Sequence, residues 1–436
     1  MSDYMFALES HLDAAQNRTV AEIQRIATEA AITVWLTGGA MRDMLRGAPI
    51  RDLDFTVERD AVRIGKALAH ALKGQITEED SLKRWVELEI PGGLRASVGN
   101  ARTEKYAKPG GKPQLAPATI HEDLSRRDFT INAIALFLNR GAKGLLVDPT
   151  NGQADLINKE LRTTNSMAFF DDPSRVFRMI RFKHVLGFEV AARTQSQLDN
   201  AVLGDYLHPD PAALGADLRA LASHESAVAA VEDLDRLGLL KLVSAAFAGE
   251  KLNLAGLSRF EKQAHSIFPA GTEDGWLAFL TVLLEKLSPK DRATALKLLA
   301  LPAGELKSFQ KLEAAAKKLE SALKSPKIHK PSQVWEAMKD AETADVLMVA
   351  YNSGIRVVQD RIRAYYQKYL PAAQEVTEEQ VAAAGHKPGT PKFDKAYQAM
   401  VITRLNARPK KVEPEPEPPP PPPMAMGRGR PPAARV

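Results

Sequence analysis

The sequence contains no cysteine, which excludes disulfide bonds, Cys-ligated zinc sites and a cysteine nucleophile. This composition is compatible with a reducing cytoplasm, and we expect a cytoplasmic protein. No apolar run is long enough to span a bilayer, so we expect no membrane partner. The first residues, MSDYMFALESHLDAAQ, lack the basic-then-apolar pattern of a signal peptide. None of the nine histidines is followed directly by aspartate, so the metal-binding His-Asp pair of an HD phosphohydrolase is missing.

What is present is typical of a globular protein with several domains. The 436 residues are enough for two or three domains, and 44% of them are hydrophobic. The formal net charge of +5 favours polyanionic partners only weakly, because many proteins that bind no nucleic acid are as basic. Nothing in the sequence indicates an oligomeric state.

The first third of the chain mixes strand-like and helix-like segments. Apolar residues recur at helical spacing over residues 62–72, and we also interpret the apolar residues 129–138 as a helix. Residues 105–118 are rich in proline, glycine and lysine, which is typical of a mobile loop. We expect strands over residues 34–36, 52–57, 85–90, 94–98 and 145–147.

Beyond Asp155 the strand signals fade, and helical patterns follow one another to about Ala407. From Arg408 the chain is dominated by proline and has few apolar side chains to bury, so we expect a disordered tail. The sequence therefore predicts an α+β protein, in which a small mixed α/β head precedes an all-α remainder. The expected divisions are residues 1–155, 156–245, 246–407 and 408–436.

The most informative stretch, residues 36–58, reads LTGGAMRDMLRGAPIRDLDFTVE. Its first strand stops at Gly38 and Gly39, where the backbone can approach an anion closely, and Arg42 follows one helical turn later. Taken alone, two glycines at this place are more often a plain strand-to-helix turn. The acidic residues that follow change that interpretation.

Asp52 and Asp54 lie two positions apart in the next predicted strand, so their side chains share one face of a sheet. Two adjacent negative charges are costly without a cation between them, and Mg²⁺ prefers carboxylate and phosphate oxygens. A phosphate cradle beside such a carboxylate pair indicates phosphoryl or nucleotidyl transfer.

Two further polar clusters follow this stretch. In EDLSRRDFTINAIAL, residues 122–136, Arg126 and Arg127 precede an expected helix, where paired arginines and the helix dipole suit a triphosphate. Salt bridges to neighbouring acids are the alternative, above all for Arg126. DPTNGQADLINKELRTTN, residues 148–165, has the pattern of a strand end, a turn and a short helix.

The last cluster, FFDDPSRVFRMIRF over residues 169–182, repeats charged residues at three-residue intervals. On one helix these residues form a slanted row, which on a surface is usually an ion-pair ladder. Because aspartate accepts and arginine donates hydrogen bonds, the row can also match the edge of a nucleobase. Its members are Asp172, Arg175, Arg178 and Arg181.

In this order, the four clusters resemble the class II nucleotidyltransferases of the polymerase-β superfamily, which comprise tRNA CCA-adding enzymes and bacterial poly(A) polymerases. The resemblance covers residues 35–188 and extends more weakly to Leu240. It implies a catalytic head with a polymerase-β-like sheet, a helical neck and body with the nucleotide template, and a helical tail that binds tRNA. The implied reaction is attack of the 3′-hydroxyl of tRNA on the α-phosphate of CTP or ATP, with Mg²⁺ as cofactor and pyrophosphate as leaving group.

The resemblance also implies roles for individual residues. Asp52 and Asp54 match the catalytic, metal-binding carboxylates. Asp172 and Arg175 match the amino-acid template that pairs with the incoming base. The full set of implied nucleotide-binding residues is Gly38, Gly39, Arg42, Arg127, Asp172, Arg175, Arg178 and Arg181.

One position departs from the family pattern. An acidic residue usually stands five positions before the arginine of the ARTEKY-like segment, and here that position is Ser97, in ASVGNARTEKY. If the usual carboxylate binds a metal or activates the primer hydroxyl, this chain lacks part of the site. Glu87 and Glu89, on the preceding strand, are candidates to replace it.

Four functions stay open from the sequence. CCA addition to tRNA is the first, and a partial enzyme that adds only CC or only A is a variant of it. Poly(A) addition is less favoured, because the GRRF-like segment and the acidic TFR-like strand of bacterial poly(A) polymerases are missing. A noncatalytic RNA-binding protein on a decayed head is the last, motivated by Ser97 and the tail.

Overall fold

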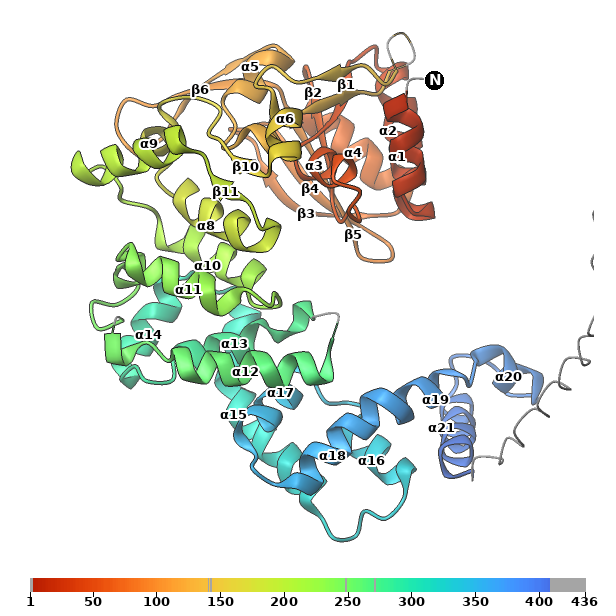
Figure 1. Cartoon of the computed structure of the whole chain (residues 1–436). Coiled ribbons are helices and arrows are strands. Elements are labelled where there is room, and N and C mark those ends of the chain that lie inside the picture. Colours follow the sequence, from red (N-terminus) through yellow and green to blue (C-terminus); the bar gives the residue numbers. More distant parts are fainter. Residues whose placement is uncertain (1–2, 140, 142, 248, 270–271, 408–436) are drawn as a thin grey trace, which may run out of the picture. The chain divides into compact units, whose positions relative to one another are not determined.

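The computed structural model describes residues 3–407, apart from 140, 142, 248 and 270–271, so the expected tail lies outside the described residues (Figure 1). The chain divides into two compact units. The first contains the residues up to Ser325 together with Asp340–Arg363, and the second contains Pro326–Lys339 together with the residues from Ala364. Among the described residues, no helix combines the length and apolar character needed to cross a membrane.

The first unit begins with a head built on a seven-stranded mixed sheet, in the order β3-β4-β5-β2-β1-β8-β9. Strands β2 and β5 run parallel, and all other neighbouring pairs are antiparallel. The five predicted strands are confirmed, with ends that differ by at most two residues. The strands of the sheet are β1 (Val34–Thr37), β2 (Leu53–Val57), β3 (Gln75–Asp80), β4 (Trp85–Ile90), β5 (Leu94–Asn100), β8 (Ala135–Phe137) and β9 (Leu146–Val147).

One face of this sheet forms the hydrophobic core of the head. Leu53, Phe55 and Val57 of β2 are fully buried on it. Helix α4 (Ala61–Leu72) packs on β3, β4 and β5, and α2 (Ala14–Glu29) packs on α4. The close approach requires Gly65, because a Cβ there would come within 2.1 Å of a methyl carbon of Val86. Since strand residues alternate, the polar residues between the buried ones face the opposite side.

Two expectations for the head were wrong. Residues 129–138 do not form a helix but a 3₁₀ turn, η1 (Thr130–Asn132), followed by strand β8. Almost every residue of this stretch is buried, so its apolar character has no period that separates helix from strand. Part of the expected loop at 105–118 is also ordered, because β7 (Gln114–Pro117) pairs with β6 (Arg102–Lys105) as a hairpin.

The remaining segments of the head and its junction are short helices. They bring the polar clusters of the sequence next to the sheet. The elements are α1 (Asp3–His11), α3 (Gly39–Leu45), α5 (Ile120–Ser125), α6 (Gly152–Asn158) and α7 (Ala168–Asp171).

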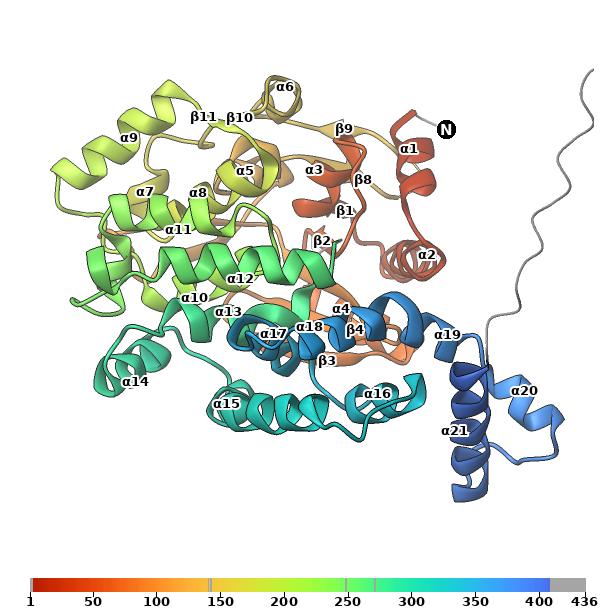
Figure 2. The ribbon, with the colours of Figure 1, turned by 60° about the horizontal axis from the view of Figure 1, so that its bottom comes forward.

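The chain beyond these helices is helical, as predicted, apart from the two-residue parallel pair β10 (Glu160–Leu161) and β11 (Glu189–Val190). Helices α12, α13, α15 and α17 pack on one another, and Figure 2 shows them side by side. The helices of this part are α8 (Arg175–Leu186), α9 (Ala192–Leu203), α10 (Pro211–Leu221), α11 (Ala227–Arg236), α12 (Leu254–Ile267), α13 (Trp276–Leu283), α14 (Pro289–Leu298), α15 (Ala303–Lys324), α17 (Thr343–Asn352) and α18 (Arg356–Ala364), with 3₁₀ turns η3 (Leu239–Leu242), η4 (Gly249–Lys251) and η5 (Glu273–Gly275).

The second unit has its own small core, in which α21 contacts the other three helices. Phe393, Val401 and Leu405 of α21 are buried there. The elements are α16 (Pro331–Met338), the π-helical turn η6 (Tyr365–Tyr369), α19 (Leu370–Gln374), α20 (Glu378–Ala383) and α21 (Pro391–Asn406).

Candidate active site

Asp54 stands in a row of polar residues that crosses neighbouring strands of the sheet. The register aligns Asp54 with Thr37 on β1 and with Ser97 on β5, and it aligns Ser97 with Glu87 on β4. The Ser97 hydroxyl donates a hydrogen bond of 2.6 Å to Oδ1 of Asp54. The row therefore lies on the polar face of the sheet, opposite the core.

Asp52, directly before β2, reaches the same face. Its carboxylate forms an ion pair with Arg95, at 3.0 Å between Nη2 and Oδ2, and Arg95 lies two residues before Ser97 on β5. Both side chains are well exposed, at 59% for Arg95 and 44% for Asp52. An exposed ion pair of this kind contributes little to stability, so a divalent cation can displace the arginine at low cost.

The turn between β1 and α3 lies against Asp54 of this row of polar residues. Gly38 has a φ of +70°, which favours glycine, and a Cβ on it would lie 3.2 Å from Oδ2 of Asp54 and 3.3 Å from Nη1 of Arg127. A glycine turn, a carboxylate and a guanidinium thus converge within contact distance. Any side chain at Gly38 would fill the space between them.

Arg127 is held in place by groups on three sides. Its Nη2 donates to the hydroxyls of Thr37 and Thr56 at 3.2 and 3.1 Å, and it pairs with Asp123 at 3.0 Å. Burial alone raises the pKa of Asp123, but Arg127 and Arg126 outweigh it and keep that pKa below its ordinary value. Asp123 is therefore a buried anion that fixes both arginines, as the sequence allowed for Arg126.

Arg42 is also engaged within the protein. Its Nη1 donates to the side-chain oxygen of Asn132 at 2.9 Å, and its Nη2 pairs with Asp43 at 2.8 Å. The guanidinium carbon lies 5.1 Å from the centre of the Phe182 ring. Arg42 thus links α3 to η1 and α8, and its positive charge is partly neutralised by Asp43.

The donor set of the polar face fits a magnesium ion. Mg²⁺ is usually bound by one or two carboxylates together with substrate phosphates and water. Asp52 and Asp54 supply two such carboxylates, and the described residues contain no group of three or more His, Cys, Asp or Glu side chains arranged around a metal position. Asp52 and Asp54 would hold the ion, and the phosphates of a nucleotide would provide further ligands.

Glu87 is the acid that shares the row with Ser97. Burial raises the pKa of Glu87, the charges of Glu78, Asp52 and Asp54 raise it further, and Arg95 opposes them. Glu89, the other candidate from the sequence, aligns with Arg95 instead. The register thus separates two candidates that the sequence left equal.

The expected row of charged residues from Asp172 to Arg181 does not follow one helix. Helix α8 begins at Arg175, and Asp172 lies in the turn after α7 with its Oδ2 3.9 Å from Nε of Arg175. Arg175 is only 5% exposed, and its Nη2 donates to the carbonyl of Arg126 at 2.8 Å. Its Nη1 has no hydrogen-bond partner among the described residues. A buried N–H without an acceptor is costly.

The next two arginines of α8 are used in ion pairs. Arg178 pairs with Asp128 at 2.6 Å, and Arg181 pairs with Asp217 at 2.5 Å while its guanidinium lies 4.6 Å from the ring centre of Phe182. These ion pairs join α8 to other segments, so they differ from the ladder within one helix that the sequence left as the alternative. They anchor α8 against the head and against α10.

Sequence reasoning missed several residues that shape the site. Thr37 and Thr56 hold Arg127, and Arg95 neutralises Asp52. Arg95 had a signal, because it lies two residues before Ser97 in a predicted strand. The threonines had none, since their role depends on the pairing of β1 with β2.

Comparison with known proteins shows which proteins this chain resembles. Residues 34–162 match the model of the poly A polymerase head domain. Over 211 residues the chain is 36% identical to an A-adding tRNA nucleotidyltransferase of Halalkalibacterium halodurans, covering 46% of this chain and 49% of the relative. It is 34% identical to a CC-adding enzyme of Deinococcus radiodurans over 203 residues, covering 47% and 53%. The chain thus spans about half the length of these curated relatives.

Solved structures are similar over a longer region. A structure titled as a tRNA-processing enzyme in an apo form covers 91% of this chain and 99% of its own, with a TM-score of 0.58 and 22% identity. The CCA-adding enzyme of Thermotoga maritima, solved with tRNA, covers 93% and 96%, with a TM-score of 0.53 and 23% identity. At these identities the likeness shows the fold. Residues 34–162 are thus similar to the poly A polymerase head domain, and about half of the chain is similar to curated tRNA nucleotidyltransferases.

Proposed function

We propose that this chain adds nucleotides from CTP and ATP to the 3′ end of tRNA, with Mg²⁺ as cofactor and pyrophosphate as the second product. The observation that carries the proposal is the convergence of the Gly38 turn, Asp54 and Arg127 within contact distance, in a chain whose residues 34–162 match the poly A polymerase head domain. Curated relatives of both partial specificities, A-adding and CC-adding, support tRNA as the substrate.

The roles of the site residues follow from their contacts. Asp52 and Asp54 would hold Mg²⁺, with Asp52 exchanging Arg95 for the metal. Bound there, the metal would lower the pKa of the attacking 3′-hydroxyl and stabilise the charge of the leaving pyrophosphate. The hydrogen bond from Ser97 fixes Oδ1 of Asp54, while Oδ2 lies nearest the Gly38 turn. That turn has no side chain, so a triphosphate can approach the backbone there, beside the positive charge of Arg127.

Base selection is assigned to Asp172 and Arg175. Cytosine and adenine share one feature, a ring nitrogen that accepts a hydrogen bond next to an amino group that donates one. The guanidinium of Arg175 would supply the donor for the ring nitrogen, and the half-buried carboxylate of Asp172 would supply the acceptor. Guanine and uracil present an N–H at the corresponding position, which would face the arginine and be rejected.

The extent of addition is a finer question. Full CCA addition remains our first candidate, since one donor–acceptor pair suits both bases. Addition of A alone is favoured by a specific observation, because three curated relatives named A-adding match the chain with 28–36% identity. Poly(A) addition and RNA binding without catalysis remain as alternatives that an assay separates.

The test is an incorporation assay with Mg²⁺ and labelled CTP or ATP. Its substrates are tRNA transcripts that end before CC, before A and after CCA, together with an unstructured RNA. An enzyme that adds the whole CCA sequence completes it on each shortened tRNA and then stops. An enzyme that adds only A extends only the transcript that lacks A. Long A tails on any RNA would identify a poly(A) polymerase. RNA binding without incorporation would identify a noncatalytic protein and refute the proposal.

Matched variants connect the assay to the site. Asp52→Ala and Asp54→Ala should each lower incorporation by roughly 100-fold or more while leaving tRNA binding intact, because the lost group is a metal ligand. Glu58→Ala removes an exposed carboxylate just after β2 and should leave activity unchanged. Undiminished turnover in either aspartate variant would count against the metal assignment.

A further inference from the structure

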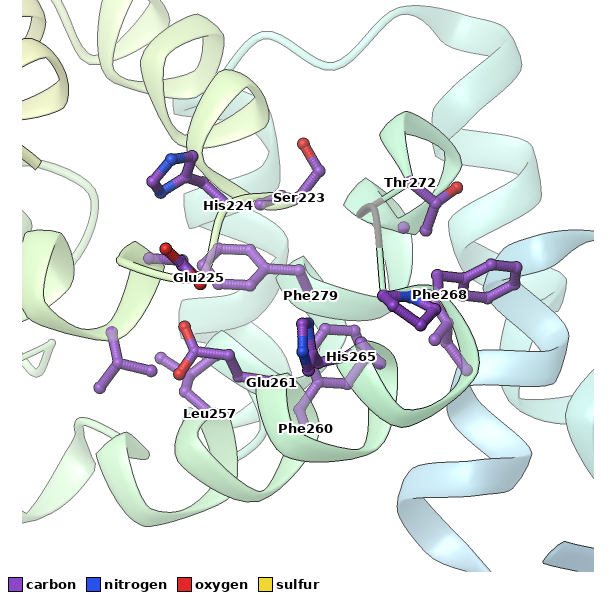
Figure 3. Close-up of a pocket in the computed structure, with 17 residues that line it drawn as sticks. Ser223, His224, Glu225, Leu257, Phe260, Glu261, His265, Phe268, Thr272 and Phe279 are labelled. Atoms are coloured by element: carbon purple, nitrogen blue, oxygen red, sulfur yellow. The ribbon is translucent and has the colours of Figure 1, made fainter. Parts of the chain in front are cut away.

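The helical body contains a cavity that shares no residue with the candidate active site. It has a volume of about 230 Å³ and lies between the α10–α11 turn, α12, the segment before α13, and α13 itself (Figure 3). A volume of this size holds a molecule of one ring with a short substituent. Sites of this kind combine apolar walls with a few polar groups that fix the orientation of a ligand.

Two neighbouring carboxylates give the cavity an excess of negative charge. The carboxylate of Glu261, on α12, lies near the backbone N–H groups of Val228 and Ala227 at the start of α11, and these groups act to lower its pKa. Its Oε1 is buried and has no hydrogen-bond partner among the described residues. Burial raises the pKa of Glu261, and the nearby charge of Glu225 adds to that rise. Burying a carboxylate such as that of Glu261 beside a second acid, Glu225, is costly unless a hydrogen-bond donor or a cation is nearby.

His224, one of the two histidines that line the cavity, does not supply that cation. Burial lowers the pKa of His224, with only Glu225 acting strongly in the opposite direction, so its ring is neutral at pH 7. His224 Nδ1 also accepts the backbone N–H of Ser226. His224 therefore adds no positive charge to this side of the cavity.

Aromatic rings form the wall next to the carboxylates. Phe260 and Phe279 both line the cavity, with ring centres 6.4 Å apart and planes inclined at 64°. Figure 3 shows the rings of Phe260 and Phe279 and the carboxylates of Glu225 and Glu261 around one space. Aromatic faces attract cations, and they also pack against a flat apolar body.

We propose that this cavity binds a small organic cation, an ammonium or amidinium ion carried on a flat apolar body. The charged N–H groups donate to the carboxylates of Glu261 and Glu225, and the apolar body packs against Phe260 and Phe279. Nucleotides and RNA phosphates are disfavoured, because two carboxylates line the cavity. The proposal does not depend on the nucleotidyltransferase activity, because the two sites share no residue.

The test is calorimetric titration of the full chain with three probes of similar size. Benzamidinium should bind in the micromolar to millimolar range, whereas neutral benzyl alcohol and anionic benzoate should show at least about tenfold weaker binding. Equal affinity for all three probes would show that the cavity does not distinguish charge, and it would overturn the proposal. Saturable binding of guanosine without binding of benzamidinium would identify a nucleobase site and would overturn it as well.

Variants locate the binding. Glu225→Gln and Glu261→Gln should each weaken benzamidinium at least about tenfold, because a charge-assisted hydrogen bond is lost. Glu225 is exposed, so its variant keeps the fold even if Glu261→Gln loosens the start of α11. Glu232→Gln, at an exposed position of α11 outside the cavity, is the matched control and should bind as the wild type does. Unchanged affinity in Glu225→Gln and Glu261→Gln would refute the site, whatever the incorporation assay shows.

Discussion

Arg175 combines deep burial with an unused hydrogen-bond donor. Nη2 of this residue is satisfied by the carbonyl of Arg126, but Nη1 has no partner among the described residues. A folded protein rarely leaves such a group unpaired. Our proposal places the edge of the incoming nucleobase against Arg175 and Asp172.

Arg175→Ala should therefore impair base selection more than metal binding. We expect the preference for CTP and ATP over UTP and GTP to fall about 10- to 100-fold, because a base-specific contact contributes ~1–3 kcal/mol. Misincorporation from each nucleotide, measured with primed tRNA, gives the ratio. Arg193→Ala, at an exposed position of α9, is the control. Unchanged selectivity in Arg175→Ala would remove the residue from the template role.

Glu87 provides the second prediction for a single residue. Its carboxylate adds negative charge near Asp52 and Asp54, where the usual acid is replaced by Ser97. Glu87→Gln should raise the Mg²⁺ concentration for half-maximal activity by about tenfold, as the loss of a group behind the metal ligands does. Glu89→Gln, two residues along the same strand, should have a much smaller effect. Equal effects of the two variants would show that the alignment of Glu87 with Ser97 has no special influence on Mg²⁺ binding.

Helix α8 is linked to its neighbours by ion pairs from Arg178, Arg181 and Lys183. The pair between Arg178 and Asp128 joins this helix to the segment that carries Arg127. Burial alone raises the pKa of Asp128, but the charge and hydrogen bonds of Arg178, together with Asn132, bring it well below its ordinary value. The carboxylate is therefore ionised in the folded protein under conditions in which an unfolded chain would already be protonated.

This shift predicts a loss of stability in acid. A carboxylate with a lowered folded-state pKa stabilises the fold above its unfolded pKa of about 4, and the contribution disappears as the pH falls further. Asp128→Asn should lower stability at pH 7 and flatten the decline of urea midpoints between pH 5 and pH 2, values chosen to bracket that window. Asp199→Asn, an exposed change on α9, should keep the wild-type pH profile. A variant profile as steep as that of the wild type would refute this role of Asp128.

The elements also show where sequence patterns are sufficient. Strands β1, β2 and β4 are short apolar or alternating runs with clear ends, and the pattern predicts them well. The region of η1 and β8 is buried almost throughout, so its apolar residues show no period of two or of 3.6. The sequence therefore predicts a helix there, which is wrong. Strand β7 contains Pro117 and was missed because its pairing with β6, rather than its own residues, makes it a strand.

At the scale of the whole chain, local patterns predict helices but not their partners. Residues 326–339 belong to the second unit, whereas residues 340–363, which follow directly, belong to the first. Such a division depends on contacts between residues distant in sequence, and no composition change marks it. The polar row from Glu87 to Thr37 has the same origin, because strand register aligns residues that lie far apart along the chain.

The account as a whole depends on Asp52 and Asp54 binding one metal ion together with a nucleotide. The most direct test is a titration of Mn²⁺ in the presence of a non-hydrolysable ATP analogue, followed by electron paramagnetic resonance. We predict that Asp52→Asn and Asp54→Asn each weaken Mn²⁺ binding at least about tenfold, while Glu58→Gln binds as the wild type does. Undiminished Mn²⁺ binding in both aspartate variants would contradict the account.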